Sequence, residues 1–378
     1  MNYSLQDFSL QAYLEELRPL IDVDCGTLTK DGIEIIANQM AKKYLDLGWY
    51  VKRVDCGIAG TGLEIRNKPD RKDVDVMLMG HMDTVFPVGT VQARPMTFDE
   101  KRAYGPGVSD MKSGLLNIVY ALRGMEKETL DKLSICICMN PDEEIGSLHS
   151  EEWLKHVATN AKNVLVAEAA RADGSLVKAR KGMARYRLTF AGKAAHAGNG
   201  PQNGRSAITE MANWILGINK LTNVKSGTTL NVGVVNGGAG ANIVPEHAEA
   251  VVDVRFWDND EYADADTKIR TMAETPFVDG VTVTVVREAH KPSMVPSEKT
   301  EALIALVEEA GQELGIDIKW QEVGGGSDAN LTAVMGIPTL DGFGPAGAGF
   351  HSAEEYLELD TIEPRIQLLQ KVLAKLAG

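Results

Sequence analysis

The sequence has few cysteines, few aromatic residues and no long hydrophobic run. Four cysteines among 378 residues are too few for a disulfide scaffold, and two of them, Cys136 and Cys138, stand in an apolar run typical of a buried strand. No segment approaches the roughly 20 apolar residues of a membrane-spanning helix. The N-terminal residues have no basic run and predict an amphipathic helix rather than a signal peptide. These absences favour reduced thiols and a cytoplasmic protein.

The sequence also lacks an excess of positive charge. The net charge is −14, and no basic run is long enough to form a nucleic-acid-binding surface. We therefore expect neither nucleic acid nor a membrane among its partners. Because a single hydrophobic core stops growing near ~250–300 residues, a chain of 378 residues has room for two domains.

Strands alternate with helices over residues 1–179, and most of the strands end in a polar residue. This alternation predicts an α/β fold with a mixed, mostly parallel sheet and helices on both faces, whose ligand site lies along the carboxyl edge of the strands. The expected strands are residues 50–54, 62–65, 74–79, 133–139 and 164–167.

A different pattern begins near residue 180. Strands at 184–190, 228–235, 248–256 and 281–287, with helices at 206–221 and 261–273, predict a separate α+β domain of the ferredoxin-like type. A helix at 300–314, a strand at 316–320 and a helix from 361 then return to the alternation of strands and helices seen over residues 1–179. Residues 1–179 and 292–378 would thus form one discontinuous catalytic domain, and residues 180–291 an inserted domain.

An imidazole and a carboxylate follow the apolar run Val76–Met79. His81 and Asp83 would share one face of a strand, and a carboxylate beside an imidazole fixes the tautomer of a metal ligand. A single His-x-Asp is more often a surface arrangement. However, other residues of this kind also fall at expected strand ends or element junctions, and they are Asp110, Glu143, Glu144, Glu168 and His351.

These side chains suit two divalent ions held about 3.5–4 Å apart. His81 and His351 would be the terminal imidazoles, Asp110 the bridge, and Glu144 and Glu168 the terminal carboxylates. Nitrogen and oxygen ligands without thiolate favour zinc, although cobalt or manganese would also fit.

Glu143 is then free to act as a general base beside Glu144. A carboxylate one hydrogen bond from an activated water can take its proton and later pass it to a leaving amine. Adjacent residues face different ways in a regular element, so the loop Asn140–Gly146 must be irregular for both to point inward. Taken alone, the Glu-Glu pair is as well explained as a solvated acidic turn.

Eight motifs extend the pattern over nearly the whole chain: GHMDTVFP, YGPGVSDMKSGL, NPDEEIGS, the strand ending in Glu168, FAGKAAHAG, GGAGANIVPEHAEAVVDVRF, GGGSDAN and FHSAEEY. In order and spacing they resemble the di-zinc exopeptidase superfamily of carboxypeptidase G, aminoacylase and succinyl-diaminopimelate desuccinylase. Within it the chain most resembles the carboxypeptidase G (glutamate carboxypeptidase) branch.

The resemblance implies an amidohydrolase that removes a C-terminal amino acid from small peptides or N-acyl amino acids, through attack by a hydroxide that bridges two zinc ions. His81 and Glu168 would bind one zinc, Glu144 and His351 the other, and Asp110 both. Asp83 would orient His81, Glu143 would be the base, and the Asp110-Met111 bond would be cis.

The resemblance also assigns a role to the inserted domain, as a lid and dimerisation domain. His196 would reach the partner subunit's site in a homodimer and stabilise the oxyanion. Asn242 would bind the substrate's amide oxygen and Arg255 its terminal carboxylate. Gly325, in the loop Gly324–Gly326, would offer a backbone N–H or room for a substrate carboxylate.

One position departs from the family's pattern. Glutamate-specific members tend to have Arg-Pro where the chain returns to the catalytic domain, and this chain has Lys291-Pro292. Lysine is a point charge rather than a planar fork, so a preference for C-terminal glutamate does not follow. Lys291 is interpreted either as a substrate-binding residue or as a surface lysine at a hinge.

Two other functions compete with this hypothesis. An aminoacylase or dipeptidase of the same superfamily would differ only in its side-chain pocket, and a non-catalytic member would bind a small molecule without hydrolysing it. The glycine pattern Gly342-x-Gly344-x-x-Gly347 matches a dinucleotide fingerprint, but it follows only a short strand and no apolar helix comes after it. We therefore expect no nucleotide site there.

Overall fold

The computed structural model describes residues 8–378, which divide into two compact units. Unit 1 comprises the described residues up to Ala179 together with Val295–Val323 and Ser327–Gly378. Unit 2 comprises Arg180–Met294 and Gly324–Gly326. Among residues 8–378, no helix combines the length and the apolar character that a membrane span requires.

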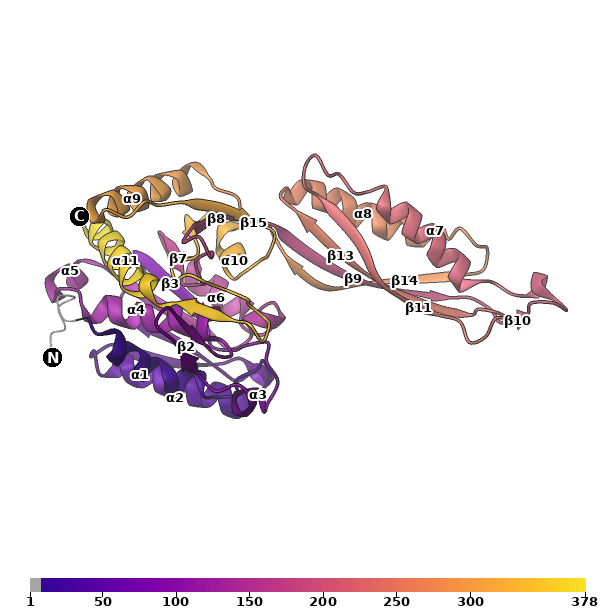
Figure 1. The fold of residues 1–378 in the computed structure, drawn as a ribbon. Coiled ribbons are helices and arrows are strands. Elements are labelled where there is room, and N and C mark those ends of the chain that lie inside the picture. Colours follow the sequence, from indigo (N-terminus) through magenta and orange to yellow (C-terminus); the bar gives the residue numbers. More distant parts are fainter. Residues whose placement is uncertain (1–7) are drawn as a thin grey trace. The chain divides into compact units, whose positions relative to one another are not determined.

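Unit 1 is built on a six-stranded sheet (Figure 1). Its strands, in spatial order, are β1 (Tyr50–Asp55), β2 (Thr61–Arg66), β6 (Ile135–Asn140), β3 (Val76–His81), β7 (Val164–Val166) and β16 (Thr339–Leu340). The last four run parallel, and β2 pairs antiparallel with both of its neighbours, β1 and β6. Every residue of β3 and β6 is buried, which means that both faces of the sheet are covered. The predicted α/β class with a mixed, mainly parallel sheet is confirmed.

Unit 1 also contains helices and a small four-stranded sheet. The helices are α1 (Leu10–Ile21), α2 (Lys30–Leu45), α3 (Thr90–Ala93), α4 (Ser113–Arg123), α5 (Lys127–Lys132), α6 (Glu151–Ala158), α9 (Glu298–Leu314), α10 (Ala329–Ala333) and α11 (Ile362–Ala377). The small sheet has the order β17 (Gly347–Ala348), β18 (Tyr356–Glu358), β5 (Arg102–Tyr104) and β4 (Thr97–Phe98). Helix α9 begins where Ser297 accepts the N–H of Thr300 and ends at Gly315 with φ 70°.

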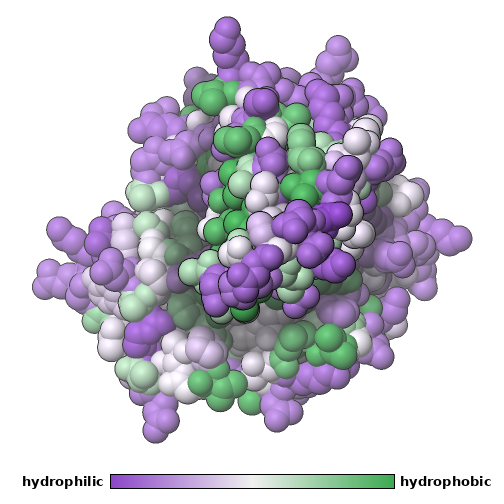
Figure 2. Space-filling model, turned by 90° about the vertical axis from the view of Figure 1, so that its right-hand side faces the viewer, coloured by the Kyte–Doolittle hydropathy of each residue, from purple (hydrophilic) through white to green (hydrophobic). Residues whose placement is uncertain are grey.

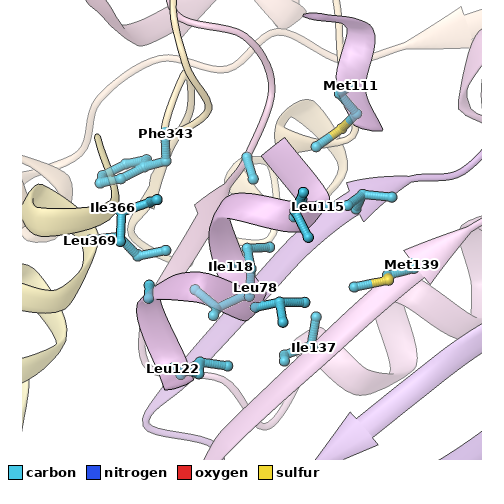
Figure 3. Close-up of a cluster of buried hydrophobic side chains, with 14 of the residues drawn as sticks. Leu78, Met111, Leu115, Ile118, Leu122, Ile137, Met139, Phe343, Ile366 and Leu369 are labelled. Atoms are coloured by element: carbon cyan, nitrogen blue, oxygen red, sulfur yellow. The ribbon is translucent and has the colours of Figure 1, made fainter. Parts of the chain in front are cut away.

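Part of the core of unit 1 lies between the sheet, α4 and α11 (Figure 3). Leu115, Ile118 and Leu122 recur at helical spacing on α4 and are all buried. They lie between sheet residues of β3 and β6 and residues of α11; the labelled partners are Leu78, Ile137, Met139, Ile366 and Leu369. This packing fixes the start of α4, which begins three residues after Asp110, against the end of β3.

Unit 2 has a four-stranded antiparallel sheet with two helices on one face (Figure 1). The strand order is β11 (Thr229–Gly237), β13 (His247–Phe256), β9 (Gly182–Ala191) and β14 (Thr282–Lys291), and the helices are α7 (Ala207–Asn219) and α8 (Asn259–Glu274). Burial alternates along β9, as expected for a sheet with one covered face. Trp214 of α7 packs edge-on against Phe190 in this second core.

The strand predicted at 316–320 is wrong. The structure forms β15 at Trp320–Val323, paired with β8 (Leu176–Arg180). The N–H of Ile316 bonds to the carbonyl of Gly311, and Ile318 lies against Gly311, where an added Cβ would meet its side chain at 2.3 Å. The apolar residues after α9 therefore cover the last turn of the helix and do not extend a sheet.

Candidate metal centre

The predicted ligands lie on segments that meet at one edge of the unit 1 sheet. His81 is the last residue of β3, Glu168 follows β7, and Glu144 lies in the 3₁₀ turn Glu143–Ile145 that follows β6. These three strands are neighbours and parallel, so their carboxyl ends coincide. Asp110 lies in the turn before α4, and His351, with φ 61°, lies in the loop before β18.

The two carboxylate oxygens of Asp110 face two different imidazoles. Oδ1 is 3.2 Å from His81 Nε2, which is also 3.6 Å from Glu168 Oε1. Oδ2 is 3.1 Å from His351 Nε2, which is 3.2 Å from Glu144 Oε2. The five groups thus form two imidazole–carboxylate pairs that share Asp110.

The donor set fits divalent cations. His81, Asp110 and Glu144 have ligand atoms within 4.8 Å of one another. Burial lowers the pKa of His81, but the carboxylates of Glu168, Asp110 and Asp83 shift it well above its usual value. Burial raises the pKa of Glu144 to about 7. Divalent cations would stabilise the same groups in their ligand forms, neutral imidazole and ionised carboxylate.

Asp83 is fully buried and contacts two parts of this centre. The Nδ1 atom of His81 is 3.0 Å from the backbone oxygen of Asp83 and 3.3 Å from its Oδ1. The shorter contact is the better hydrogen bond, so the backbone carbonyl has the larger part in orienting the ring. The Asp83 carboxylate also accepts the backbone N–H groups of Glu143 (3.1 Å) and Glu144 (3.2 Å) and the hydroxyl of Thr27 (2.6 Å).

The turn that contains Glu143 and Glu144 is irregular, as two adjacent glutamates at one site require. The 3₁₀ turn is neither strand nor α-helix, and the Asp83 carboxylate holds it by accepting the backbone N–H groups of Glu143 and Glu144. Asp142, also fully buried, precedes the turn. Its carboxylate accepts hydrogen bonds from the Ser150 hydroxyl (2.5 Å) and from the backbone N–H of His149 (2.7 Å). Asp142 was not predicted from the sequence, because nothing in the run Asp-Glu-Glu distinguishes the three acids.

The turn that carries Asp110 contains the expected cis bond between Asp110 and Met111. Met111 is buried, and its sulfur lies 3.2 Å from the backbone N–H of His81, which donates to it. An added Cβ on Gly80 would meet the Met111 methyl group at 2.5 Å. The residue after Asp110 therefore packs directly on the strand end that presents His81.

Peptidase family M20/M25/M40 matches the chain over residues 77–375. The chain belongs to this family. The resemblance drawn from the motifs is thereby confirmed, and the protein is a hydrolase and a metallopeptidase.

Relatives cover almost the whole M20 chain. Carboxypeptidase G2 of Pseudomonas sp. (strain RS-16) is 28% identical over 375 residues, covering 97% of this chain and 90% of that protein. Succinyl-diaminopimelate desuccinylase of Cupriavidus necator is 24% identical, covering 98% and 95%. The aminopeptidase PepT of Bacillus cereus ATCC 10987 shares the fold, with a TM-score of 0.81 and 24% identity over 98% of this chain and 99% of that one.

In unit 2 of this M20 peptidase, His196 and Asn242 lie side by side. His196 is on β10 (Ala195–His196), which pairs with β12 (Ile243–Val244), and the backbone oxygen of Asn242 accepts the N–H of Ala197 at 2.9 Å. The Nδ1 atom of His196 accepts the N–H groups of Gly198 (3.0 Å) and Asn199 (3.2 Å). In the neutral ring the proton is therefore on Nε2, as an exposed donor.

The other predicted substrate-binding residues lie at the opposite end of the unit 2 sheet. Arg255 and Lys291 both stand opposite Met183 of β9. Lys291 is only 5% exposed, so it is not a surface lysine. Met183 is eight residues from the other end of β9, a span of roughly 26 Å at strand geometry. The structure thus separates Arg255 and Lys291 from the pair His196 and Asn242.

The Gly324–Gly326 loop lies at the Arg255 end. Arg255 Nη1 is 3.5 Å from the oxygen of Gly324, and Arg180 Nη1 donates to the oxygen of Gly325 at 3.0 Å. An added Cβ on Gly324 or Gly325 would meet nothing within 4 Å, so packing within the chain does not require glycine there. Arg180 was not predicted from the sequence; the only signal for it there is the basic run Lys178–Lys181.

Proposed function

We propose that this M20 peptidase is a di-zinc exopeptidase that removes the C-terminal amino acid from small peptides or N-acyl amino acids. The observation that carries the proposal is the division of Asp110, whose two oxygens face separate imidazole–carboxylate pairs. A carboxylate placed in this way suits two cations rather than one.

In this proposal His81 and Glu168 bind one zinc, Glu144 and His351 the other, and Asp110 both; cobalt or manganese are possible substitutes. When bound, the two ions would polarise the scissile carbonyl and lower the pKa of the attacking water. The nitrogen and oxygen donors and the absence of a thiolate among these five residues support zinc in a catalytic rather than a structural site.

Glu143 is the general base. The Asp83 carboxylate accepts its backbone N–H and holds the turn in which Glu143 stands next to the ligand Glu144. Its carboxylate accepts a proton from the attacking water and donates it to the leaving amine, and the amine then departs as a neutral group.

The substrate is bound by the basic side chains at the Arg255 end of the unit 2 sheet. The Arg255 guanidinium, whose Nε donates to Asp253 at 2.8 Å, binds the terminal carboxylate of the substrate. Lys291 and Arg180 add positive charge near the Gly325 loop. The name of the relative carboxypeptidase G2 supports this choice of a carboxylate-bearing substrate.

His196 stabilises the oxyanion of the partner subunit's site in a homodimer, with Asn242 beside it on the substrate's amide oxygen. Support comes from the Nε2–H donor of His196 and from its place at the end of the unit 2 sheet that is remote from Arg255. The edge strand β11 favours pairing with a second copy, because Val234 and Val235 are 59% and 52% exposed.

The other edge of this sheet is a poorer candidate for pairing. Strand β14 carries the exposed charges Arg287 and Glu288, which oppose edge-to-edge association. Figure 2 shows one face of the molecule, on which hydrophobic side chains lie at the surface among hydrophilic ones. We further propose a cytoplasmic location, since the four cysteines are buried free thiols.

A hydrolysis screen tests the reaction. Dipeptides and N-acyl amino acids varied at the C-terminal residue are each compared with the same compound carrying a C-terminal amide. We expect cleavage of the free acids only, abolished by a chelator and restored by zinc or cobalt. Equal cleavage of the amides would exclude a carboxypeptidase, and cleavage of N-acyl amino acids alone would favour an aminoacylase.

Subunit mixing tests the role of His196. His196→Ala and Glu143→Ala chains, each inactive, are mixed, dissociated and reassociated. If His196 serves the partner's site, half of the dimers contain one intact site, and about a quarter of wild-type activity returns. If the residue serves its own chain, no activity returns.

A further inference from the structure

We propose that Glu355 is a positioning residue that holds the bridging ligand Asp110 in place. The inference deepens the proposed metal centre and rests on it. Glu355 lies four residues beyond the ligand His351 and is 1% exposed. Its side chain is directed away from solvent and into the turn that precedes α4.

The carboxylate of Glu355 accepts three backbone N–H groups of that turn. Oε2 accepts the N–H of Gly107 at 2.9 Å, and Oε1 accepts those of Ser109 at 2.9 Å and Asp110 at 3.0 Å. Three N–H groups that converge on one anion form a nest, and the anion determines the conformation of the chain that surrounds it. One of the three belongs to the bridging ligand itself.

The turn does not have a regular conformation of its own. Gly107 has φ 76°, and Asp110 and Met111 have non-helical angles (φ −111°, ψ 90° and φ −133°, ψ 35°) inside a helical run. Its backbone N–H groups therefore cannot be satisfied by a regular helix, and the Glu355 carboxylate supplies acceptors that the helix does not.

The same loop contacts the turn a second time. An added Cβ on Gly347 would meet Ser109 Oγ at 2.0 Å, so the backbone of residue 347 lies against the residue before Asp110. Glu355 and Gly347 thus flank His351 in sequence and both contact the Asp110 turn. The chain segment that supplies a terminal ligand for one metal therefore also sets the position of the carboxylate shared by both.

Glu355→Ala, Glu355→Gln and Glu354→Gln test the proposal in the full-length protein. Glu354 is the matched control, because it is the neighbouring glutamate and its side chain is exposed. In Glu355→Gln the amide oxygen can still accept from Ser109 and Asp110, but the amide NH₂ meets the N–H of Gly107, so two donors face each other. Zinc affinity is measured by competition with a chromophoric chelator, and the cobalt-loaded proteins are compared by visible absorption.

Loss of a partner that orients a metal ligand typically weakens metal binding by about 10–100-fold. We expect zinc binding to weaken by about 100-fold in Glu355→Ala and by about 10-fold in Glu355→Gln, with an altered cobalt spectrum in both. Glu354→Gln should have the zinc affinity and the cobalt spectrum of the wild type. If Glu355→Ala does not fold, Glu355→Gln alone decides. Wild-type zinc affinity and cobalt spectrum in a folded Glu355 variant would overturn the proposal, even if its melting temperature fell.

The outcome separates this inference from the proposed reaction. If the wild-type protein binds zinc but hydrolyses none of the substrates, the assignment of substrate fails while the order of zinc affinities still tests Glu355. If the wild-type protein binds neither zinc nor cobalt, the metal centre and the inference are both overturned.

Discussion

Asp83 shows how one buried carboxylate can serve two neighbouring groups. Its backbone oxygen takes the shorter contact with His81, and its two carboxylate oxygens accept the N–H groups of Glu143 and Glu144. The sequence predicted only the contact with His81, because residues 60 positions apart are brought together by the tertiary structure alone.

Replacing Asp83 by Asn separates these two tasks. The backbone carbonyl near His81 is unchanged, but the amide NH₂ would face one of the two backbone donors. We expect zinc content near that of the wild type and a fall in kcat of about 10–100-fold. Zinc per chain is measured by atomic emission, and kcat with the best substrate. A loss of zinc that matches the loss of activity would contradict this division.

Glu143→Gln tests the general base. The amide keeps the size of the side chain but cannot accept a proton from water, whereas none of the five proposed ligands is changed. We expect full zinc content and a loss of kcat of about 10²–10⁴-fold. Unchanged turnover would exclude Glu143 as the base.

At the scale of the element, the glycine-rich loop after β16 has a structural explanation that its sequence did not suggest. Gly344 lies against the carbonyl groups of Ala167 and Glu168, and Gly347 lies against Ser109 and the carbonyl of Tyr356. The pattern that matched a dinucleotide fingerprint therefore marks close approaches to the two segments that carry Glu168 and Asp110.

Gly347→Ala is expected to damage this packing. Its Cβ would lie 2.0 Å from Ser109 Oγ and 2.4 Å from the carbonyl oxygen of Tyr356, so backbone must shift. Such overpacking typically costs about 1–3 kcal/mol of unfolding free energy. We expect a lower melting temperature together with weaker zinc binding, measured by calorimetry and chelator competition. An unchanged melting temperature would show that the loop relaxes freely.

At the scale of the whole molecule, unit 2 carries two separate sets of candidate residues. Arg255 and Lys291 lie at one end of its sheet, and His196 and Asn242 at the other. A homodimer formed through β11 would give both sets a role, and it would make catalysis depend on association.

Val235→Lys on the edge strand tests this dependence. The valine is 52% exposed, and a charge on an edge strand opposes pairing with a second copy. We expect a monomer in sedimentation experiments and a loss of activity per chain. Val224→Lys is the control, since Val224 is 79% exposed but lies before β11. A dimeric and active Val235→Lys protein would exclude this edge as the interface.

The sequence by itself determined the class of the fold and the chemical types in the site. Apolar runs such as Val76–Met79 predict buried strands, and parallel strands must end at one edge, so His81, Glu144 and Glu168 could be gathered before any contact was known. Asp110 at a predicted strand-to-helix junction and His351 in the last quarter of the chain completed the set, and the motifs around them supported it by resemblance.

Only the tertiary structure decided which atoms meet. The two-sided contacts of Asp110, the nest around Glu355 and the second role of Asp83 join residues that are 29 to 248 positions apart in the chain. A local pattern reports which face a side chain takes, because that depends on neighbouring residues. A local pattern carries no information about which distant backbone N–H will donate a hydrogen bond to that side chain, because the partner depends on how the segments pack.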